Sequence, residues 1–381
     1  MPPPPGISIS PAKTVRLLRM NAHRRLLAVL AAATLVAAPT AGRAEDATGD
    51  LRIGIAAPLS GSASVLGGQV RAGVNAAAAA TGGWAAVEAD TQCAADAAAE
   101  GARALAAAKV DAVVGFLCTE ALEAALPILT AAGIPVIVVG VRANRFTDKR
   151  EKTGALVWRI APRAGAEADA VAKDLAKRWH DVPFGLIDDG SIYGRGLSDA
   201  VRSRLEASGL RAASTDNYRP AEEKQFGLVR RILASGVTHL FIAGDRPDVA
   251  IIARDADSLD LELDIVGGET LLDEATPDVP LQRGVHAIAL RNRFETIAAG
   301  SDGAPEAREG YFGPAFAATE IAAAAVRFAR KEARPVAEIL NEQTFATALG
   351  PVRFDAVGDS SLDLFQVFRF DGEDFMPEAG G

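Results

Sequence analysis

Few residues in this sequence have types and spacings that could do chemistry. The adjacent carboxyl groups of Asp188 and Asp189 could carry out acid–base catalysis. An aspartate pair that follows a predicted strand is, however, more typical of a turn or a helix cap. His180, His239 and His286 lie far apart in the sequence, and no nucleotide-binding loop, H-E-x-x-H or G-x-S-x-G motif is present. Nothing in the sequence therefore supports an enzyme, a cofactor or a metal site.

The two cysteines, Cys93 and Cys118, are the other candidates for chemistry. They form no C-x-x-C motif, and no histidine lies nearby in the sequence to activate a thiol. In an oxidising compartment a lone pair of cysteines favours a structural disulfide, and closing a loop of this length contributes roughly 3.5 kcal/mol. A catalytic or redox-active thiol is the alternative.

The N-terminal segment indicates such a compartment. From Met20 a basic start is followed by the apolar run 26–38 and by small residues before Glu45, which is the pattern of a secretory signal peptide cleaved after Ala44. The apolar run is shorter than the roughly 20 residues of a membrane span. A buried helix of the mature fold is the alternative. We predict residues 1–44 to be a signal peptide with an N-terminal extension, and the protein to be soluble and periplasmic.

Composition indicates a globular protein with an acidic surface. The 381 residues are 49% hydrophobic and 23% charged, and the net charge is −9. Six of the basic residues and none of the acidic ones precede residue 45, so the rest of the chain is more acidic than this total. An acidic body argues against nucleic acid or an anionic membrane as a partner.

Short apolar runs alternate with alanine-rich helical stretches along the chain, which predicts an α/β fold with mostly parallel sheets. The pattern restarts after a break near residue 160, so we expect two doubly wound (Rossmann-like) lobes. In such lobes ligands bind where strands end at their carboxyl edge. The polar turns expected there are 58–66, 117–119, 140–144, 188–193, 244–246 and 268–270.

Several of these strand-end segments resemble one family. They are I-G-I-A-A-P-L-S-G-S at 53–62, the cysteine pair, D-D-G-S-I-Y-G-R-G-L at 188–197 and L-G-P-V-R-F-D-A-V-G-D at 349–359. Together they resemble the leucine/isoleucine/valine-binding proteins, which are type I periplasmic solute-binding proteins of ABC importers. The resemblance extends from about residue 51 to residue 370. It includes the C-x24-C spacing of a family disulfide, followed by a hydroxyl residue.

The resemblance implies the fold and the division of the chain. In the family, two lobes are joined by three crossovers and the ligand is buried when the lobes close. Here the crossovers are expected near 161–163, 289–291 and 351–355. One lobe would comprise 45–161 plus 290–351, and the other 162–289 plus 352–381.

The resemblance also implies ligand-binding residues. Thr119 matches the hydroxyl residue that meets the ligand carboxylate, and Gly140 matches a position that offers backbone groups. Tyr193 matches an aromatic residue that covers the ligand, and Glu269 matches the carboxylate that pairs with the ligand ammonium. No catalytic residue and no metal ligand is implied.

Three departures from the family pattern leave the ligand open. Arg142 replaces a threonine, Leu66 replaces an aromatic residue and Asp245 replaces a tyrosine. Phe316 stands at a third aromatic position. The guanidinium of Arg142 could bind a ligand carboxylate, pair with Asp245 or Glu269, or point into solvent. A branched-chain amino acid, a polar or charged amino acid and another small carboxylate are therefore all compatible with the sequence.

The expected function is that of a periplasmic substrate-binding protein. It would act as a monomer, without a cofactor, and deliver a small amino acid or related carboxylate to an inner-membrane ABC permease. A periplasmic sensor of the same fold, acting on a membrane receptor or regulator, is the alternative. An exported enzyme would require a nucleotide loop or a nucleophile–base pair, and the sequence has neither.

Overall fold

The computed structural model describes residues 51–82, 84–273, 279–297 and 308–378. The predicted signal peptide and N-terminal extension, residues 1–44, lie outside the described residues. Among the described helices, none is both long enough and apolar enough to cross a lipid bilayer.

The first sheet is fully parallel, with the strand order β2-β1-β3-β4-β5. Its strands are short apolar runs, as buried parallel strands usually are. They are β1 (Arg52–Ala57), β2 (Ala85–Asp90), β3 (Ala112–Gly115), β4 (Val136–Val138) and β5 (Val157–Arg159). The associated helices are α1 (Ser64–Thr81), α2 (Ala95–Ala107), α3 (Thr119–Ala131), α4 (Arg145–Asp148), α5 (Arg150–Thr153), α10 (Phe312–Glu332) and α11 (Val336–Glu342). With the hairpin of β11 (Thr344–Thr347) and β12 (Gly350–Arg353), they form lobe 1.

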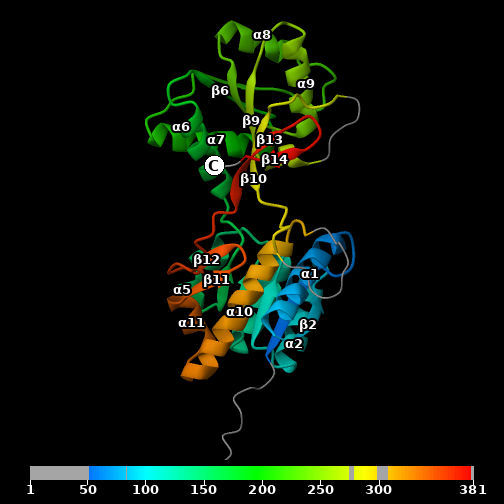
Figure 1. The fold of residues 1–381 in the computed structure, drawn as a ribbon, viewed down its shortest axis with the longest axis vertical. Coiled ribbons are helices and arrows are strands. Elements are labelled where there is room, and N and C mark those ends of the chain that lie inside the picture. Colours follow the sequence, from blue (N-terminus) through cyan, green and yellow to red (C-terminus); the bar gives the residue numbers. More distant parts are fainter. Residues whose placement is uncertain (1–50, 83, 274–278, 298–307, 379–381) are drawn as a thin grey trace, which may run out of the picture. The chain divides into compact units, whose positions relative to one another are not determined.

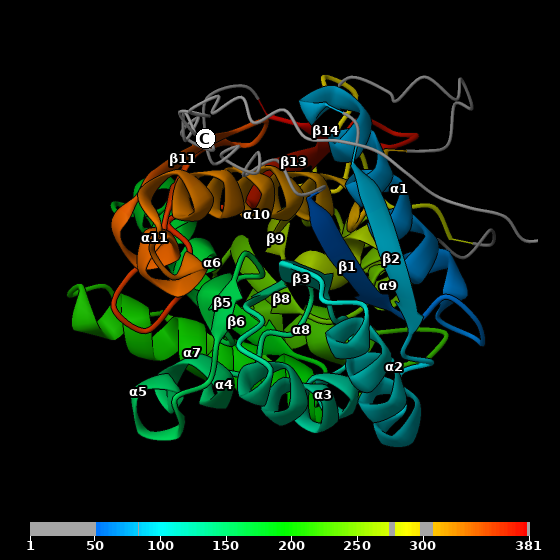
Figure 2. The same cartoon turned by 90° about the horizontal axis from the view of Figure 1, so that it is seen from below.

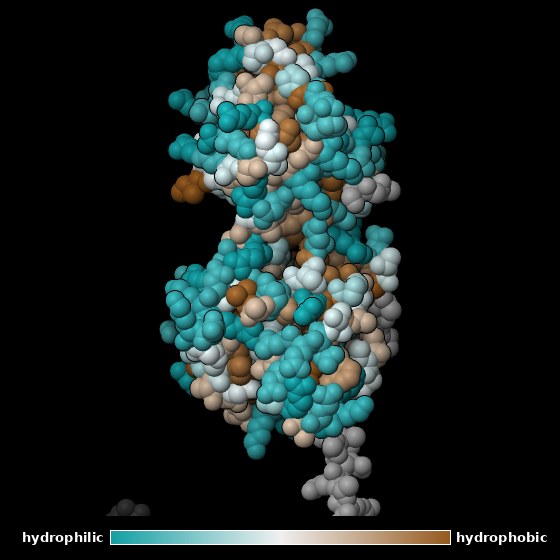
Figure 3. Space-filling model, turned by 90° about the vertical axis from the view of Figure 1, so that its left-hand side faces the viewer, coloured by the Kyte–Doolittle hydropathy of each residue, from teal (hydrophilic) through white to brown (hydrophobic). Residues whose placement is uncertain are grey.

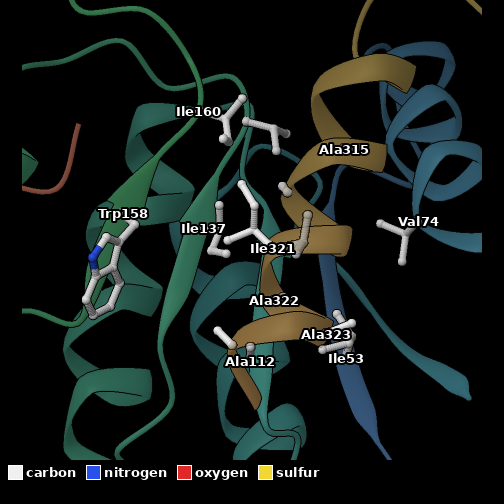
Figure 4. Packing of buried hydrophobic residues seen from close by; sticks show 14 of the residues in the cluster. Ile53, Val74, Ala112, Ile137, Trp158, Ile160, Ala315, Ile321, Ala322 and Ala323 are labelled. Atoms are coloured by element: carbon white, nitrogen blue, oxygen red, sulfur yellow. The ribbon is translucent and has the colours of Figure 1, made fainter. Parts of the chain in front are cut away.

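Lobe 1 has three layers. Helices α1 and α10 cover one face of the sheet, and α2 and α3 cover the other (Figure 2). Ile137 of the sheet packs under Ile321 and Ala322 of α10 in the first of these interfaces (Figure 4). Small residues let the helices approach closely: a Cβ on Gly73 would lie 2.3 Å from the carbonyl oxygen of Phe312.

The second sheet has the strand order β14-β13-β10-β9-β8-β6-β7. Five strands run parallel, while β13 pairs antiparallel with β10 and β14 pairs antiparallel with β13. The strands are β6 (Phe184–Asp188), β7 (Ser214–Asn217), β8 (His239–Ala243), β9 (Asp264–Gly267), β10 (His286–Leu290), β13 (Phe365–Phe370) and β14 (Phe375–Pro377). The helices α6 (Ala166–Arg178), α7 (Ile192–Ala207), α8 (Phe226–Ser235) and α9 (Arg246–Asp257) complete lobe 2.

Lobe 2 is also layered, with α6 and α7 on one face of its sheet and α8 and α9 on the other. In Figure 1 the elements of lobe 2 are coloured from green at α6 through yellow at β10 to red at β14. Hydrophilic side chains predominate on the face of the molecule shown in Figure 3. Two α/β lobes with mostly parallel sheets confirm the predicted fold class.

The chain passes between the two sheets three times, after β5, after β10 and after β12. Three crossovers are those that the resemblance implies. The structure assigns each helix and strand to a lobe but does not fix the residue at which one lobe ends. The lobe boundaries at residues 161, 289 and 351 therefore stay a prediction.

A buried ion pair joins the first crossover to the third. The guanidinium of Arg159, whose side chain is 2% exposed, donates from Nε to Oδ1 of Asp359 at 2.8 Å. Arg163 binds the other carboxylate oxygen of Asp359. Arg159 also donates to the carbonyl oxygen of Arg142 at 2.8 Å and to the hydroxyl of Thr147 at 3.0 Å. This network fixes the two crossovers and the loop after β4 against one another.

We expect Arg159→Met to lower the free energy of unfolding by roughly 3–5 kcal/mol, because it removes the main partner of a buried carboxylate. Urea unfolding of the purified protein measures the loss. Arg163→Met is the matched control. Arg163 binds the same carboxylate of Asp359, but its side chain is 37% exposed. Its loss should therefore stay below about 1 kcal/mol. Equal losses in the two variants would contradict this account of the pair.

Candidate functional site

An ion pair joins strand-end loops of the two lobes. Arg142, from the loop after β4, donates from Nη1 and Nη2 to the two carboxylate oxygens of Glu269 at 2.7 and 2.9 Å. Glu269 begins the short 3₁₀ helix η1 (Glu269–Leu272) directly after β9. The two side chains are 33% and 27% exposed. Of the roles considered for Arg142, the structure shows the pairing with Glu269, in the planar two-bond geometry that arginine favours.

The backbones on both sides of this pair are held in place. The carbonyl oxygen of Arg142 accepts hydrogen bonds from Arg159 at 2.8 Å and from the backbone N–H of Ala164 at 2.9 Å. The backbone N–H of Glu269 donates to Oε1 of Glu167 at 2.9 Å. A Cβ on Gly268 would lie 2.5 Å from that same oxygen, so a larger residue here would displace the Glu167 carboxylate.

Glu167, in the first turn of α6, is a site residue that the sequence did not reveal. It is 7% exposed, and its Oε1 accepts a second hydrogen bond, from the hydroxyl of Tyr193 at 2.7 Å. Burial and the neighbouring charge of Glu269 raise the pKa of Glu167. Burial and the charge of Glu167 likewise raise the pKa of Tyr193. One signal could have found Glu167: it stands four residues before Val171, on the buried face of α6.

Tyr311, just before α10, is a second residue that was missed. Its ring lies against Gly140, where a Cβ would be 3.1 Å from the ring carbon Cε1. Burial raises its pKa, and the charge of Arg142 opposes that rise. The guanidinium itself loses solvation by burial, but the hydrogen bonds and charge of Glu269 outweigh this loss and raise the pKa of Arg142. Tyr311 therefore lies within the electrostatic reach of the ion pair.

The predicted aromatic position Phe316 lies elsewhere. It is 3% exposed and belongs to an apolar cluster of lobe 1 with Phe294 and Phe312. Its ring is 6.2 Å from that of Phe312, centroid to centroid. Packing within lobe 1 is thus the role that the structure gives it, and a ligand contact by Phe316 stays a prediction.

The other predicted site residues lie at strand ends of the two lobes. Thr119 begins α3 and is partly exposed, Gly140 follows β4, and Asp245 precedes α9 and is exposed. Leu66 in the first turn of α1 is 41% exposed, and Tyr193 in the first turn of α7 is 38% exposed. Their contacts with a ligand stay predictions.

The predicted disulfide is present. Cys93 and Cys118 are bonded, with their Cα atoms 5.2 Å apart. The bond connects the loop after β2 to the loop after β3, directly before Thr119. The same loop leaves β3 through Gly115, whose φ of +141° and close approach to Ala56 exclude a side chain.

The aspartate pair at the end of β6 has the turn role that the sequence favours. Asp188 accepts a hydrogen bond from the backbone N–H of Gly190 at 2.8 Å, and Asp189 accepts one from Ser191 at 2.9 Å. Within the described part of the chain, no group of His, Cys, Asp and Glu residues is arranged to hold a metal ion.

We expect the stability gained by Glu167→Gln, relative to the unchanged protein, to increase as pH rises above 4.5, the ordinary glutamate pKa. Because the pKa of Glu167 is raised in the folded state, ionising this carboxyl group destabilises the fold. The unchanged protein therefore loses stability as pH rises through the folded-state pKa, and the glutamine variant does not. Glutamine keeps the acceptor oxygen for Tyr193 and Glu269 but carries no charge. Urea unfolding at pH 4.5 and at about pH 7 measures the difference.

The exposed Glu206 on α7 provides a matched control. Glu206→Gln should show the same small difference at both pH values. A difference for Glu167→Gln that does not change between the two pH values would contradict a raised pKa at this position.

Comparison with known proteins identifies the family. A family model described as periplasmic binding protein matches residues 50–368. The Leu/Ile/Val-binding protein BraC3 of Rhizobium johnstonii is 26% identical over 254 residues, which are 64% of this chain and 68% of the relative.

Two solved structures are similar in fold. An ABC transporter substrate-binding protein from Desulfitobacterium hafniense in complex with Leu has a TM-score of 0.64 and 20% identity, covering 86% of this chain and 100% of that one. A solute-binding protein of an ABC transporter from Rhodopseudomonas palustris BisB5, in complex with 3,4-dihydroxybenzoic acid, has a TM-score of 0.62 and 15% identity, covering 87% and 96%. With the family model matching most of its length, the chain belongs to the periplasmic binding protein family, in the type I group of the leucine/isoleucine/valine-binding proteins.

Proposed function

We propose that this protein is the periplasmic substrate-binding protein of an ABC transporter, and that it captures a small amino acid or related carboxylate for an inner-membrane permease. The Arg142–Glu269 pair carries the proposal. It brings opposite charges from strand-end loops of both lobes together, at the edge of each sheet where α/β proteins bind ligands. We also propose that the protein is exported by its N-terminal segment and acts as a monomer.

Binding would work as a population shift between open and closed forms. Polar groups from two lobes converge on a ligand only when the lobes close, so the ligand favours the closed form by its differential contacts. The three crossovers are where such closure would bend the chain. Because a buried charge is costly unless it is met by an opposite one, both lobes must supply charged or polar groups to the ligand.

Individual roles follow from positions in the fold. Arg142, the hydroxyl of Thr119 and the backbone at Gly140 would meet a ligand carboxylate from lobe 1. Tyr193 would contact the ligand from lobe 2, where Glu269 would lie beside the ligand and hold Arg142. Leu66 and Asp245 would lie beside the rest of the ligand.

The ligands of similar structures support this ligand class. Leucine, bound by the Desulfitobacterium hafniense protein, and 3,4-dihydroxybenzoic acid, bound by the Rhodopseudomonas palustris protein, share a carboxylate and differ in nearly everything else. A carboxylate is therefore the feature of the ligand that a site built around Arg142 would be expected to require.

We expect a screen of the purified protein against amino acids and small organic acids to find ligands that raise the melting temperature with the logarithm of their concentration. Arg142→Met should weaken the binding free energy of such a ligand by roughly 2–5 kcal/mol, because the ligand carboxylate loses its guanidinium partner. Thermal shift finds the ligand, and titration calorimetry measures the loss.

Arg202→Met is the matched control, since Arg202 pairs with Asp199 on the exposed surface of α7. It should bind the ligand as the unchanged protein does. A screen in which no amino acid and no carboxylate shifts the melting temperature would refute the proposed function.

A further inference from the structure

The carboxylate of Glu269 is already paired with a cationic side chain, that of Arg142. In a site for an α-amino acid, this carboxylate would be met by the ligand ammonium. Here both of its oxygens accept hydrogen bonds from Arg142, at 2.7 and 2.9 Å. A ligand ammonium would have to displace this guanidinium or lie beside it, next to a like charge.

The neighbouring carboxyl group does not replace Glu269 as a partner for an ammonium. Glu167 is 7% exposed, and one of its oxygens accepts hydrogen bonds from both Tyr193 and the backbone of Glu269. Burial and the charge of Glu269 also favour its protonated form, since they raise its pKa.

Arg142 keeps donors for an anion. A guanidinium has five N–H groups, and Glu269 receives hydrogen bonds from the two terminal nitrogens. In the described part of the chain, no residue accepts a hydrogen bond from Nε of Arg142, and a third of the side chain is exposed. Nε of Arg142 can therefore donate to a second carboxylate, while Glu269 stays in place and orients the group.

Large apolar side chains are exposed at strand ends of both lobes. Val65 and Leu66, in the first turn of α1, are 74% and 41% exposed. Ile192, in the first turn of α7, is 98% exposed. These turns follow β1 and β6, at the carboxyl edges of the two sheets. Such residues suit a ligand with an apolar body.

We propose that the ligand is a carboxylate with an aliphatic or aromatic body and without an α-ammonium group, and that Arg142 is the residue that excludes the ammonium. This inference rests on the proposed function and narrows it to one chemical class. Arg142 binds the ligand carboxylate, and Glu269 is its positioning residue rather than the partner of the ligand.

Matched pairs of acids that differ only in the α-ammonium group test the inference in the unchanged protein. Calorimetry should show that 4-methylpentanoate binds at least tenfold more tightly than leucine. The same difference is expected between 3-phenylpropanoate and phenylalanine. If either amino acid binds as tightly as its partner or more tightly, the inference is wrong and the proposed function stands. If no carboxylate and no amino acid binds at all, both are wrong.

The variant Arg142→Thr tests the role of Arg142. It removes the resident cation and frees Glu269, so the ratio of the two affinities should reverse in favour of leucine. Arg202→Thr on the surface of α7 should leave the ratio unchanged, and circular dichroism checks that each variant is folded. An unchanged ratio in folded Arg142→Thr would show that Arg142 does not select the ligand. Glu269→Gln adds a second readout, a weakened affinity for 4-methylpentanoate with the preference over leucine retained.

Discussion

The site depends on one electrostatic constraint: charges that leave water must be compensated by groups already in place. Arg142 and Glu269 are each about one-third or less exposed, and each compensates the other through two hydrogen bonds. The pair comes from loops of different sheets, so each of the two charges has its partner in the other lobe. Other residues must therefore hold the two loops in the positions that this pairing requires.

Each member of the pair is held by hydrogen bonds between its backbone and neighbouring residues of its own lobe. On the lobe 1 side, Arg159 binds the backbone of Arg142 and is itself neutralised by Asp359. On the lobe 2 side, Glu167 binds the backbone of Glu269 and the hydroxyl of Tyr193. Backbone contacts set the position of each charged side chain while leaving the charge itself free for its partner. Arg159, which holds the first crossover against the third, therefore also fixes the loop that carries Arg142.

The sequence was informative where local pattern and tertiary structure agree. Parallel strands buried on both faces are apolar runs, so β1, β3 and β8 were predictable, as were the helices between them. β7 was not, because Ser214–Asn217 is a polar edge strand without an apolar signal. β11, β12 and β14 were also missed, because strands of only 4, 4 and 3 residues are too short to show a period. Arg142 and Glu269 could be found from motifs at strand ends, but their pairing was only one of several roles that the sequence left open for Arg142. Glu167 looks like an ordinary acidic residue in the first turn of a helix, and only the fold shows that it is buried beside Glu269.

The cysteine bridge has a mechanical consequence. It ties the turn after β2 to the turn immediately before Thr119, and Gly115 leaves that turn packed directly on β1. Three neighbouring strand ends are thereby braced into a single stiff rim. The backbone of these cross-linked strand ends changes little when a solute binds. Adjustment to different solutes therefore has to come from side chains or from lobe 2. Rigidity on one side lowers the entropy lost on association, and it makes selection among solutes depend on a fixed template.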